Sequence, residues 1–129
     1  MAGAGTMRGH FSPAMTMHLI DIGANLTHDS FDRDRDAVLD RARQGGVVQM
    51  VITGASREHS PLAVQLAQQH PGFLYATAGV HPHHAVEYTD ECDAEMRALP
   101  AHPEVVAVGE SGLDYFRDFS PRPAQHRAF

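Results

Sequence analysis

The sequence predicts an α/β fold built on a parallel β-sheet, and two features of its pattern lead to this prediction. Four short apolar segments recur along the chain, and each is followed at once by a glycine. The stretches between them carry the capping and stop signals of helices. Strand and helix in repeated alternation are typical of right-handed βαβ units, which place successive strands parallel to one another.

The predicted strands span residues 19–22, 47–53, 73–78 and 105–108. The last of them, VVAV, is rich in β-branched residues and shows no polar alternation, which is typical of a strand covered on both faces by helices. It leads into a turn that carries Glu110 between Gly109 and Gly112. Ligand sites of such sheets lie beyond the carboxyl ends of the strands, so Glu110 is predicted to act as a metal ligand or a proton-transfer group. A capping or salt-bridged carboxylate is the structural alternative.

Three helices are predicted between the strands, and they span residues 32–44, 61–69 and 90–99. Gly45 and Gly46 close the first helix as a C-terminal stop. Ser60, followed by Pro61, is the predicted cap of the second, and Thr89 leads into the third. Cys92 falls in the third helix, where we expect a buried small side chain without chemistry.

A fourth helix is predicted to start at Ser120 and Pro121, a cap followed by a first-turn proline. It continues through residues 125–129 and stops after roughly two turns, too few for a helix to stand alone. We therefore expect a chain that ends within an element, as in a truncated reading frame.

Composition places limits on the function. The 129 residues are 43% hydrophobic and 20% charged, as in one soluble globular domain. A formal charge of -6 argues against a broad cationic surface for nucleic acid. The single cysteine excludes an internal disulfide and fits a reducing compartment, so a cytoplasmic location is expected. Residues 1–17 lack the apolar core of a signal peptide or membrane helix and are predicted to be a disordered leader to a domain at 18–129.

Functional-looking residues fall at the carboxyl end of every predicted strand. They are found at residues 21–25, 53–54, 81–83 and 110. The pattern by itself does not decide between an open doubly wound sheet and a closed barrel, but these positions would converge on one rim of a barrel.

Two histidines, His81 and His83, lie two residues apart and so face the same way on an extended segment, which Pro82 keeps from becoming a helix. Two imidazoles on one side can bind a metal or a phosphate. For His81 we expect contact with the substrate phosphate or proton transfer. For His83 substrate contact and a structural role in a solvated turn are equally open.

Four further polar residues are candidates near the rim. Asn25 could offer its carbonyl oxygen as a ligand or orient its loop through an Asx turn. Asp21 is expected to form hydrogen bonds at the rim. Arg117 suits a phosphate, and Tyr115 suits stacking on a base or packing over its loop. For the last two, an ordinary surface loop is the alternative.

Five motifs carry a resemblance to a known family. They are DIGANLT at 21–27, ITG at 52–54, AGVHPH at 78–83, VGESGLDY at 108–115 and the stretch 119–129. With these motifs the chain resembles the amino-terminal half of TatD-type deoxyribonucleases, metal-dependent hydrolases of the amidohydrolase-like barrel class. The resemblance covers residues 19–129, and the third and fourth motifs in that order are highly specific.

The resemblance implies the first four βα units of a (β/α)8 TIM barrel with a two-metal site. In that family the ligands are a carboxylate after the fourth strand, histidines after the fifth and sixth, an aspartate after the eighth and often a His-x-His pair after the first. Glu110 matches the carboxylate, whereas Gly23 and Asn25 stand at the histidine pair, as in a branch with an Asn-Leu-Thr signature. The ligands after strands five, six and eight have no counterpart in these 129 residues.

The function implied by the resemblance is metal-dependent hydrolysis of phosphodiester bonds in nucleic acid, with DNA as the substrate of the complete protein and no membrane partner. Mg²⁺ or Mn²⁺ is the expected cofactor, and Zn²⁺ is a further candidate. The chain alone is expected to be catalytically incomplete. One alternative is a non-catalytic half-barrel that associates with itself or with a partner chain through exposed sheet edges. Another is a hydrolase of the same fold that acts on a different ester or amide.

Overall fold

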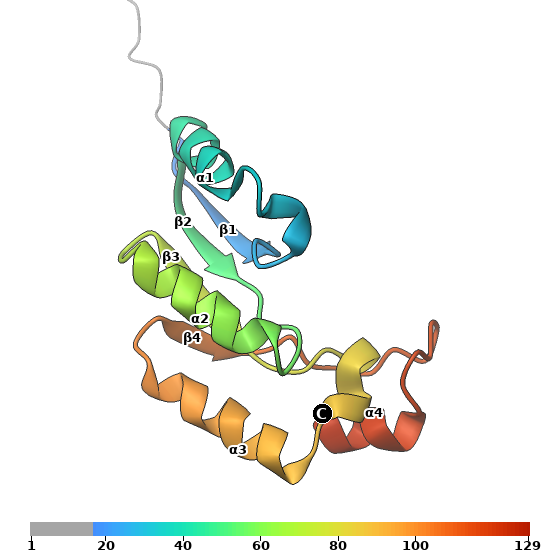
Figure 1. The fold of residues 1–129 in the computed structure, drawn as a ribbon. Helices are drawn as coiled ribbons and strands as arrows, with labels where there is room; N and C mark the ends of the chain where they lie inside the picture. Colours follow the sequence, from blue (N-terminus) through green and yellow to red (C-terminus); the bar gives the residue numbers. More distant parts are fainter. Residues whose placement is uncertain (1–16) are drawn as a thin grey trace, which may run out of the picture.

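The computed structural model describes residues 17–129, which form one four-stranded sheet with helices between the strands (Figure 1). Of the predicted leader, residues 1–16 lie outside the described residues. The strands and helices, in chain order, are β1 (Leu19–Ala24), α1 (Arg35–Gln44), β2 (Val47–Ile52), α2 (His59–Gln69), β3 (Leu74–Ala78), α3 (Asp90–Ala98), β4 (Val105–Val108) and α4 (Arg122–Ala128). Short 3-10 segments are η1 (Asp29–Phe31), η2 (Pro82–Glu87) and η3 (Leu99–Ala101).

The sheet confirms the predicted parallel α/β fold. The strands pair in the order β1-β2-β3-β4, and all three pairs are parallel. Ile52 pairs with Ala24 on one side and with Ala76 on the other, while Ala78 pairs with Val108. Because this register brings the carboxyl ends of the strands close to level, the polar residues that follow them lie along one edge of the sheet.

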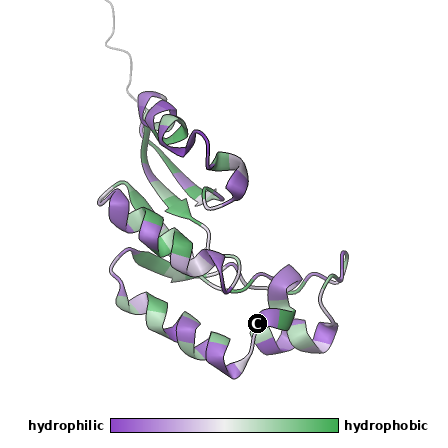
Figure 2. Ribbon diagram, in the orientation of Figure 1, coloured by the Kyte–Doolittle hydropathy of each residue, from purple (hydrophilic) through white to green (hydrophobic). Residues whose placement is uncertain are grey.

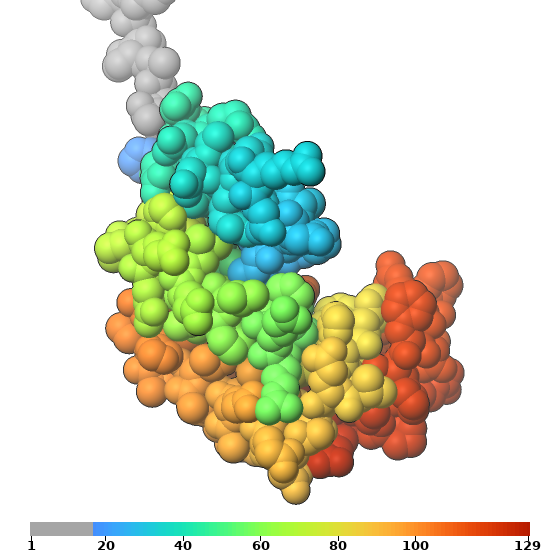
Figure 3. Space-filling view, viewed as in Figure 1, coloured from blue at the N-terminus to red at the C-terminus, as the bar shows by residue number. Residues whose placement is uncertain are grey.

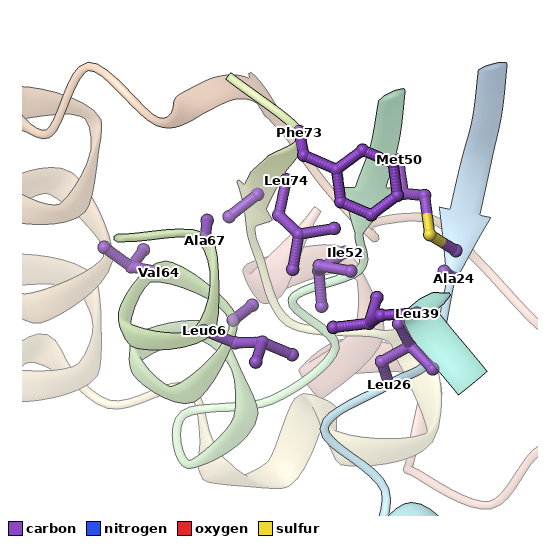
Figure 4. Close-up of a cluster of buried hydrophobic side chains, with 12 residues drawn as sticks. Ala24, Leu26, Leu39, Met50, Ile52, Val64, Leu66, Ala67, Phe73 and Leu74 are labelled. Atoms are coloured by element: carbon purple, nitrogen blue, oxygen red, sulfur yellow. The ribbon is translucent and has the colours of Figure 1, made fainter. Parts of the chain in front are cut away.

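The main core lies between the sheet and helices α1 and α2. Its side chains are apolar and come from β1, α1, β2, α2 and β3 and from the segments next to these elements, as Figure 4 shows. Leu39 of α1, Ile52 of β2 and Leu74 of β3 are fully buried. Figure 2 shows the same division along the chain, with mostly hydrophobic strands and helices that carry both kinds of residue. A second, smaller cluster surrounds Cys92, whose burial confirms the prediction and raises the pKa of its thiol.

The prediction that the strand at 105–108 is covered on both faces is wrong for the part of the chain described. β4 is an edge strand there, and Val106, Ala107 and Val108 are exposed, the last at 78%. β1 forms the opposite edge, with Ile22 exposed at 81%. The apolar sequence of β4 is that of an interior strand, but no described element lies beyond it.

Two predicted helix caps are also wrong, for one shared reason. α2 begins at His59, before Ser60, and α4 is preceded by Pro121 without a side-chain cap. The hydroxyls of Ser60 and Ser120 are buried and bond to the distant Gly79 and His83 instead. Thr89, by contrast, caps α3 as predicted, because its side chain accepts a hydrogen bond from the amide of Cys92.

None of the helices described in residues 17–129 has both the length and the apolar character needed to cross a membrane.

Candidate functional site

The rim, by which we mean the residues that directly follow the four strands (25–27, 53–55, 79–83 and 109–112), is held together by backbone hydrogen bonds. The amides of Thr53, His81 and Glu110 donate to the carbonyl oxygens of Ala24, Ala55 and Gly54, over 3.1, 2.9 and 2.7 Å respectively. Segments far apart in sequence are therefore tied at the same edge of the sheet, as the strand pattern predicts. In Figure 3 the surface is hollowed between the segment after β1 (blue) and the segment after β4 (red).

The turn that carries Glu110 is positioned through Gly79. A Cβ added at Gly79 would lie 2.5 Å from the carbonyl carbon of Gly109 and 2.7 Å from the backbone oxygen of Glu110, so only glycine allows this approach. Gly79 is itself fixed by the buried Ser60. The hydroxyl of Ser60 donates to the carbonyl of Gly79 over 2.9 Å and accepts from its amide over 3.1 Å. The position of Glu110 thus depends on α2, because Ser60 of α2 holds Gly79 and Gly79 lies against the turn that carries Glu110.

The carboxylate of Glu110 is exposed at the rim. Within residues 17–129 no donor forms a hydrogen bond or ion pair with this carboxylate, whereas most of the other acidic side chains there have a partner. A structural carboxylate would be expected to cap a helix or pair with a cation, and Glu110 does neither. The carboxylate of Glu110 is therefore not bound to any described side chain and is accessible to a ligand.

Of the two ring nitrogens of His81, Nδ1 forms a hydrogen bond and Nε2 forms none with the described residues. Its Nδ1 accepts a hydrogen bond from the amide of His83 over 3.2 Å. Burial lowers the pKa of the His81 imidazole, and the neighbouring His83 lowers it further, against an opposing effect of Glu110. The ring is therefore neutral near pH 7. Because Nδ1 accepts, the proton of the neutral ring lies on Nε2, which suits donation to an anionic oxygen better than metal ligation.

His83 pairs with Asp114, a residue of the loop between β4 and α4. The distance from Nε2 of His83 to Oδ2 of Asp114 is 2.7 Å, and the side chain of Asp114 is only 14% exposed. The other oxygen of Asp114 accepts from the amides of Phe116 and Arg117. The amide of Arg117 and then His83 hold the pKa of Asp114 well below its usual range. His83 is thus bound to the loop, which is the contact that a structural role requires.

Two buried polar residues, Gln125 and Ser120, complete the contact between His83 and the loop after β4. Gln125 was not singled out in the sequence, and Ser120 was predicted only as a helix cap. The side chain of Gln125 accepts from the amide of Asp114 over 2.8 Å and donates to the carbonyl of Ser120 over 2.7 Å. The hydroxyl of Ser120 donates to the carbonyl of His83 over 2.9 Å. Both residues lie in the stretch 119–129, and no local pattern there indicates that their side chains are buried.

Asp114→Asn is expected to lower the thermal midpoint near neutral pH and to flatten its decline in acid. The folded-state pKa of Asp114 lies below the unfolded value of about 3.9, so its stabilisation is present above about pH 4 and is lost as the pH falls through the folded-state pKa. The difference between wild type and variant should shrink below about pH 4. Thermal unfolding followed by circular dichroism from pH 7 down to pH 2 measures this. Asp36→Asn, in the exposed first turn of α1, is the matched control, and an equal pH profile for both variants would contradict the assignment.

Asn25 lies at the β1 end of the rim and Asp21 lies within β1, and strands β2 and β3 separate β1 from the strand that precedes Glu110. The side chain of Asn25 is exposed and forms no hydrogen bond with the described residues. The backbone carbonyl of Asn25 accepts a hydrogen bond from the amide of His28 over 3.3 Å. Asp21 accepts from the amide of Gly23 over 3.0 Å. Asp21, and not Asn25, therefore forms an Asx turn with its own backbone.

Tyr115 and Arg117 are partly committed to contacts within the loop after β4. The hydroxyl of Tyr115 bonds to Nε2 of His126, and the guanidinium of Arg122 lies 4.7 Å from the centre of its ring. Nη1 of Arg117 donates to Oδ2 of Asp114 over 3.2 Å. Both side chains remain exposed, so each keeps surface for a ligand.

The donor set fits part of a divalent-cation site. Hard cations such as Mg²⁺ and Mn²⁺ prefer oxygen ligands, and the described rim offers such oxygens in the Glu110 carboxylate and, at its other end, in the Asn25 side-chain amide. Within residues 17–129 no three His, Cys, Asp or Glu side chains are grouped so that they could hold an ion. The described rim can therefore contribute ligands without completing the site.

A parallel sheet covered by helices, with polar side chains beyond the carboxyl ends of its strands, is the arrangement in which α/β proteins bind their ligands. The sequence profile of the family described as TatD related DNase matches residues 20–129. The chain belongs to this family, as the resemblance of its motifs predicts.

Among curated relatives, the 3'-5' ssDNA/RNA exonuclease TatD of Musicola paradisiaca is 50% identical over 111 residues, which are 86% of this chain and 42% of the relative. The protein of the same name from Erwinia tasmaniensis is also 50% identical, over 43% of its length. The chain spans less than half the length of the relatives it matches.

Solved structures agree on the fold. The TatD homologue YJJV of Escherichia coli superposes with a TM-score of 0.77 and 31% identity over 88% of this chain and 44% of that one. A TatD family hydrolase from Entamoeba histolytica gives a TM-score of 0.73 and 32% identity, over 89% and 44% respectively. The four strand-helix units therefore correspond to a part of these TatD hydrolases, as expected from the motifs.

Proposed function

We propose that this chain forms the amino-terminal part, at residues 18–129, of a metal-dependent hydrolase that cleaves phosphodiester bonds in nucleic acid. The observation that carries the proposal is the exposed, unpaired carboxylate of Glu110 beside the neutral His81 at the rim. The names of the relatives support a nucleic-acid substrate, and for the complete protein we propose single-stranded DNA. A cytoplasmic location also stays a proposal, based on the single cysteine.

In this proposal Glu110 is a metal ligand, and Mg²⁺ or Mn²⁺ are the ions that suit its oxygen donor. Bound ions of this kind supply an activated water and neutralise charge that develops on the phosphate. The chain's own contribution is to fix the carboxylate through the contacts among Ser60, Gly79 and the Gly109–Glu110 peptide. His81 donates from Nε2 to a phosphate oxygen.

We propose that the remaining site residues contact the substrate, each in a different way. Arg117 offers its exposed guanidinium to a phosphate, and Tyr115 offers the part of its ring that Arg122 leaves accessible. Asn25 contributes an amide at the far end of the rim. His83 contributes mainly by holding the loop after β4 against the rim, because its Nε2 is already bound to Asp114.

The test is a nuclease assay on two proteins with labelled single-stranded DNA, with and without Mn²⁺. One protein is the 129-residue chain, and the other is this chain joined to the part of the Musicola paradisiaca relative that it does not match. We expect Mn²⁺-dependent cleavage by the fusion, loss of cleavage in EDTA, and little or none by the chain alone. A fusion that folds, binds Mn²⁺ and cleaves neither DNA nor RNA would contradict the proposal.

The second candidate, a half-barrel that associates with itself, is favoured by the exposed apolar residues of the edge strands β1 and β4. Ile22 and Val108 expose most of their surface on strands whose outer backbone groups have no described partner strand. Light scattering on the samples of the same assay separates the candidates. A chain that is inactive and monomeric at all concentrations would argue against this second role.

A further inference from the structure

Three aromatic rings form a continuous row that leads from the rim to the surface. The ring centres of His81 and His83 lie 4.3 Å apart with nearly perpendicular planes, and those of His83 and Phe119 lie 4.7 Å apart. Phe119 ends the row with 69% of its surface exposed. A ring in contact with the candidate site on one side and with solvent on the other is placed to bind a flat ligand group.

A second phenylalanine, Phe116, is presented by the same loop between β4 and α4 and is 93% exposed. Fully burying such a side chain is worth about 1.5–3 kcal/mol, so two exposed phenylalanines in one short loop leave considerable apolar area uncovered. Exposed apolar side chains gathered in one loop are typical of an interaction site.

The loop that carries both rings is held in place by hydrogen bonds. The carboxylate of Asp114 accepts from the amides of Phe116 and Arg117, and Gln125 bonds to the backbone on both sides of the turn. Because little conformational freedom remains to be lost, a ligand that binds these rings pays a small ordering cost.

The charge of the chain indicates which interaction would hold a nucleic-acid strand here. With a formal charge of -6, the protein gains little from general attraction to phosphates. Near the rings, Arg117 and Arg122 are both paired with carboxylates of the same loop, Asp114 and Asp118. Stacking of bases on aromatic rings does not depend on net positive charge.

We propose that Phe119 and Phe116 form a stacking platform for the bases of a single-stranded nucleic acid whose phosphate lies at the rim beside His81. This inference rests on the proposed function, which it deepens by naming the contact that recognises the substrate. Binding is driven mainly by stacking, with one or two phosphate contacts from Arg117 and His81.

The test measures the affinity of the full 129-residue chain for a fluorescein-labelled single-stranded DNA oligonucleotide by anisotropy, in EDTA so that no cleavage occurs. Phe119→Ala and Phe116→Ala should each weaken binding by about 5- to 150-fold, the range measured for base–aromatic stacking. Phe119→Leu should lose a similar factor, because it keeps apolar area but no ring, and Phe119→Trp should retain the affinity. Phe129→Ala is the matched control, since Phe129 is 73% exposed but lies outside this loop.

Two further measurements separate stacking from phosphate binding. An abasic oligonucleotide should bind wild type about as weakly as the normal oligonucleotide binds Phe119→Ala. The plot of log affinity against log salt should have a slope no steeper than about -1.5, as expected for about two phosphate contacts on a single strand.

The proposal is overturned if wild type does not bind the oligonucleotide, or if Phe119→Ala and Phe116→Ala bind as wild type does. Unchanged affinity together with a lower urea midpoint or a changed mass by light scattering would show that protein, and not a base, covers the rings. The outcome is distinguishable from failure of the proposed function, because binding is measured without metal. If binding depends on the rings but the fusion does not cleave, the proposed stacking platform is supported and only the proposed hydrolase function is contradicted.

Discussion

Glu110→Gln in the fusion protein is expected to lower metal-dependent cleavage of single-stranded DNA by about 100-fold or more. Metal ions contribute several kcal/mol to such reactions, and roughly 1.4 kcal/mol corresponds to a factor of ten in rate. Glutamine keeps the size of the side chain but removes the anionic oxygen that a divalent cation requires. Because the carboxylate has no partner among residues 17–129, its replacement should leave the free energy of unfolding nearly unchanged.

Rates under saturating and limiting Mn²⁺, together with a urea unfolding curve for each protein, separate a lost ligand from a damaged fold. Part of the loss should be recovered at high Mn²⁺ if the remaining ligands still bind the ion weakly. Glu91→Gln, at an exposed position of α3, is the matched control and should cleave at the wild-type rate. Full activity of Glu110→Gln would remove Glu110 from the proposed metal site.

Gly79→Ala is expected to destabilise the 129-residue chain by about 1–3 kcal/mol, the range typical of overpacked interiors. The added methyl group would lie 2.5 Å from the carbonyl carbon of Gly109, and the atoms it meets belong to the backbone and cannot rotate away. Relief requires that the turn carrying Glu110 move away from β3. In the fusion protein the same substitution should therefore lower activity in addition to stability.

Urea denaturation followed by circular dichroism measures the change. Gly23→Ala provides the comparison, because a Cβ at Gly23 meets nothing within 4 Å, and its effect should stay within about 0.5 kcal/mol. If both glycine variants unfold at the same urea concentration, the close contact between Gly79 and the Glu110 turn does not constrain the fold.

Much of the fold could be predicted because its signals are local. The strands β2, β3 and β4 lie within one residue of their predicted limits, and β1 extends two residues further, to Ala24. Thr89 caps α3 as predicted, since a cap bonds to an amide only three residues away. α1 begins at Arg35, three residues later than predicted, because η1 and a turn occupy the preceding residues.

The wrong predictions concern side chains that can bond either to a backbone group nearby in the sequence or to one far away in it. Ser60 and Ser120 both precede or occupy a helix start next to a proline, which is the pattern of an N-cap. In the folded chain their hydroxyls bond to Gly79 and His83 across the sheet edge. Nothing in the local sequence shows that a backbone group from another unit will be within reach.

The residues of the candidate site also differ in whether local sequence or distant contacts determine their placement. Glu110, His81 and Asn25 could be named from their positions after predicted strands, although their roles remain proposals. Asp114, Gln125 and Ser120 could not be placed, because their contacts join the loop after β4 to the segment after β3, and sequence spacing does not report that distance. The aromatic row from His81 through His83 to Phe119 was missed for the same reason.

The sequence by itself determined the parallel α/β fold, the order of its units and the edge at which polar residues gather, because hydrophobic periodicity and glycine positions act over a few residues. Only the tertiary structure decided which of those residues are bound to neighbours and which are exposed to a ligand. That outcome depends on groups far apart in the chain, such as the buried hydroxyl of Ser60 and the backbone of Gly79. It separates the unpaired carboxylate of Glu110 from the fully bonded carboxylate of Asp114, four residues later.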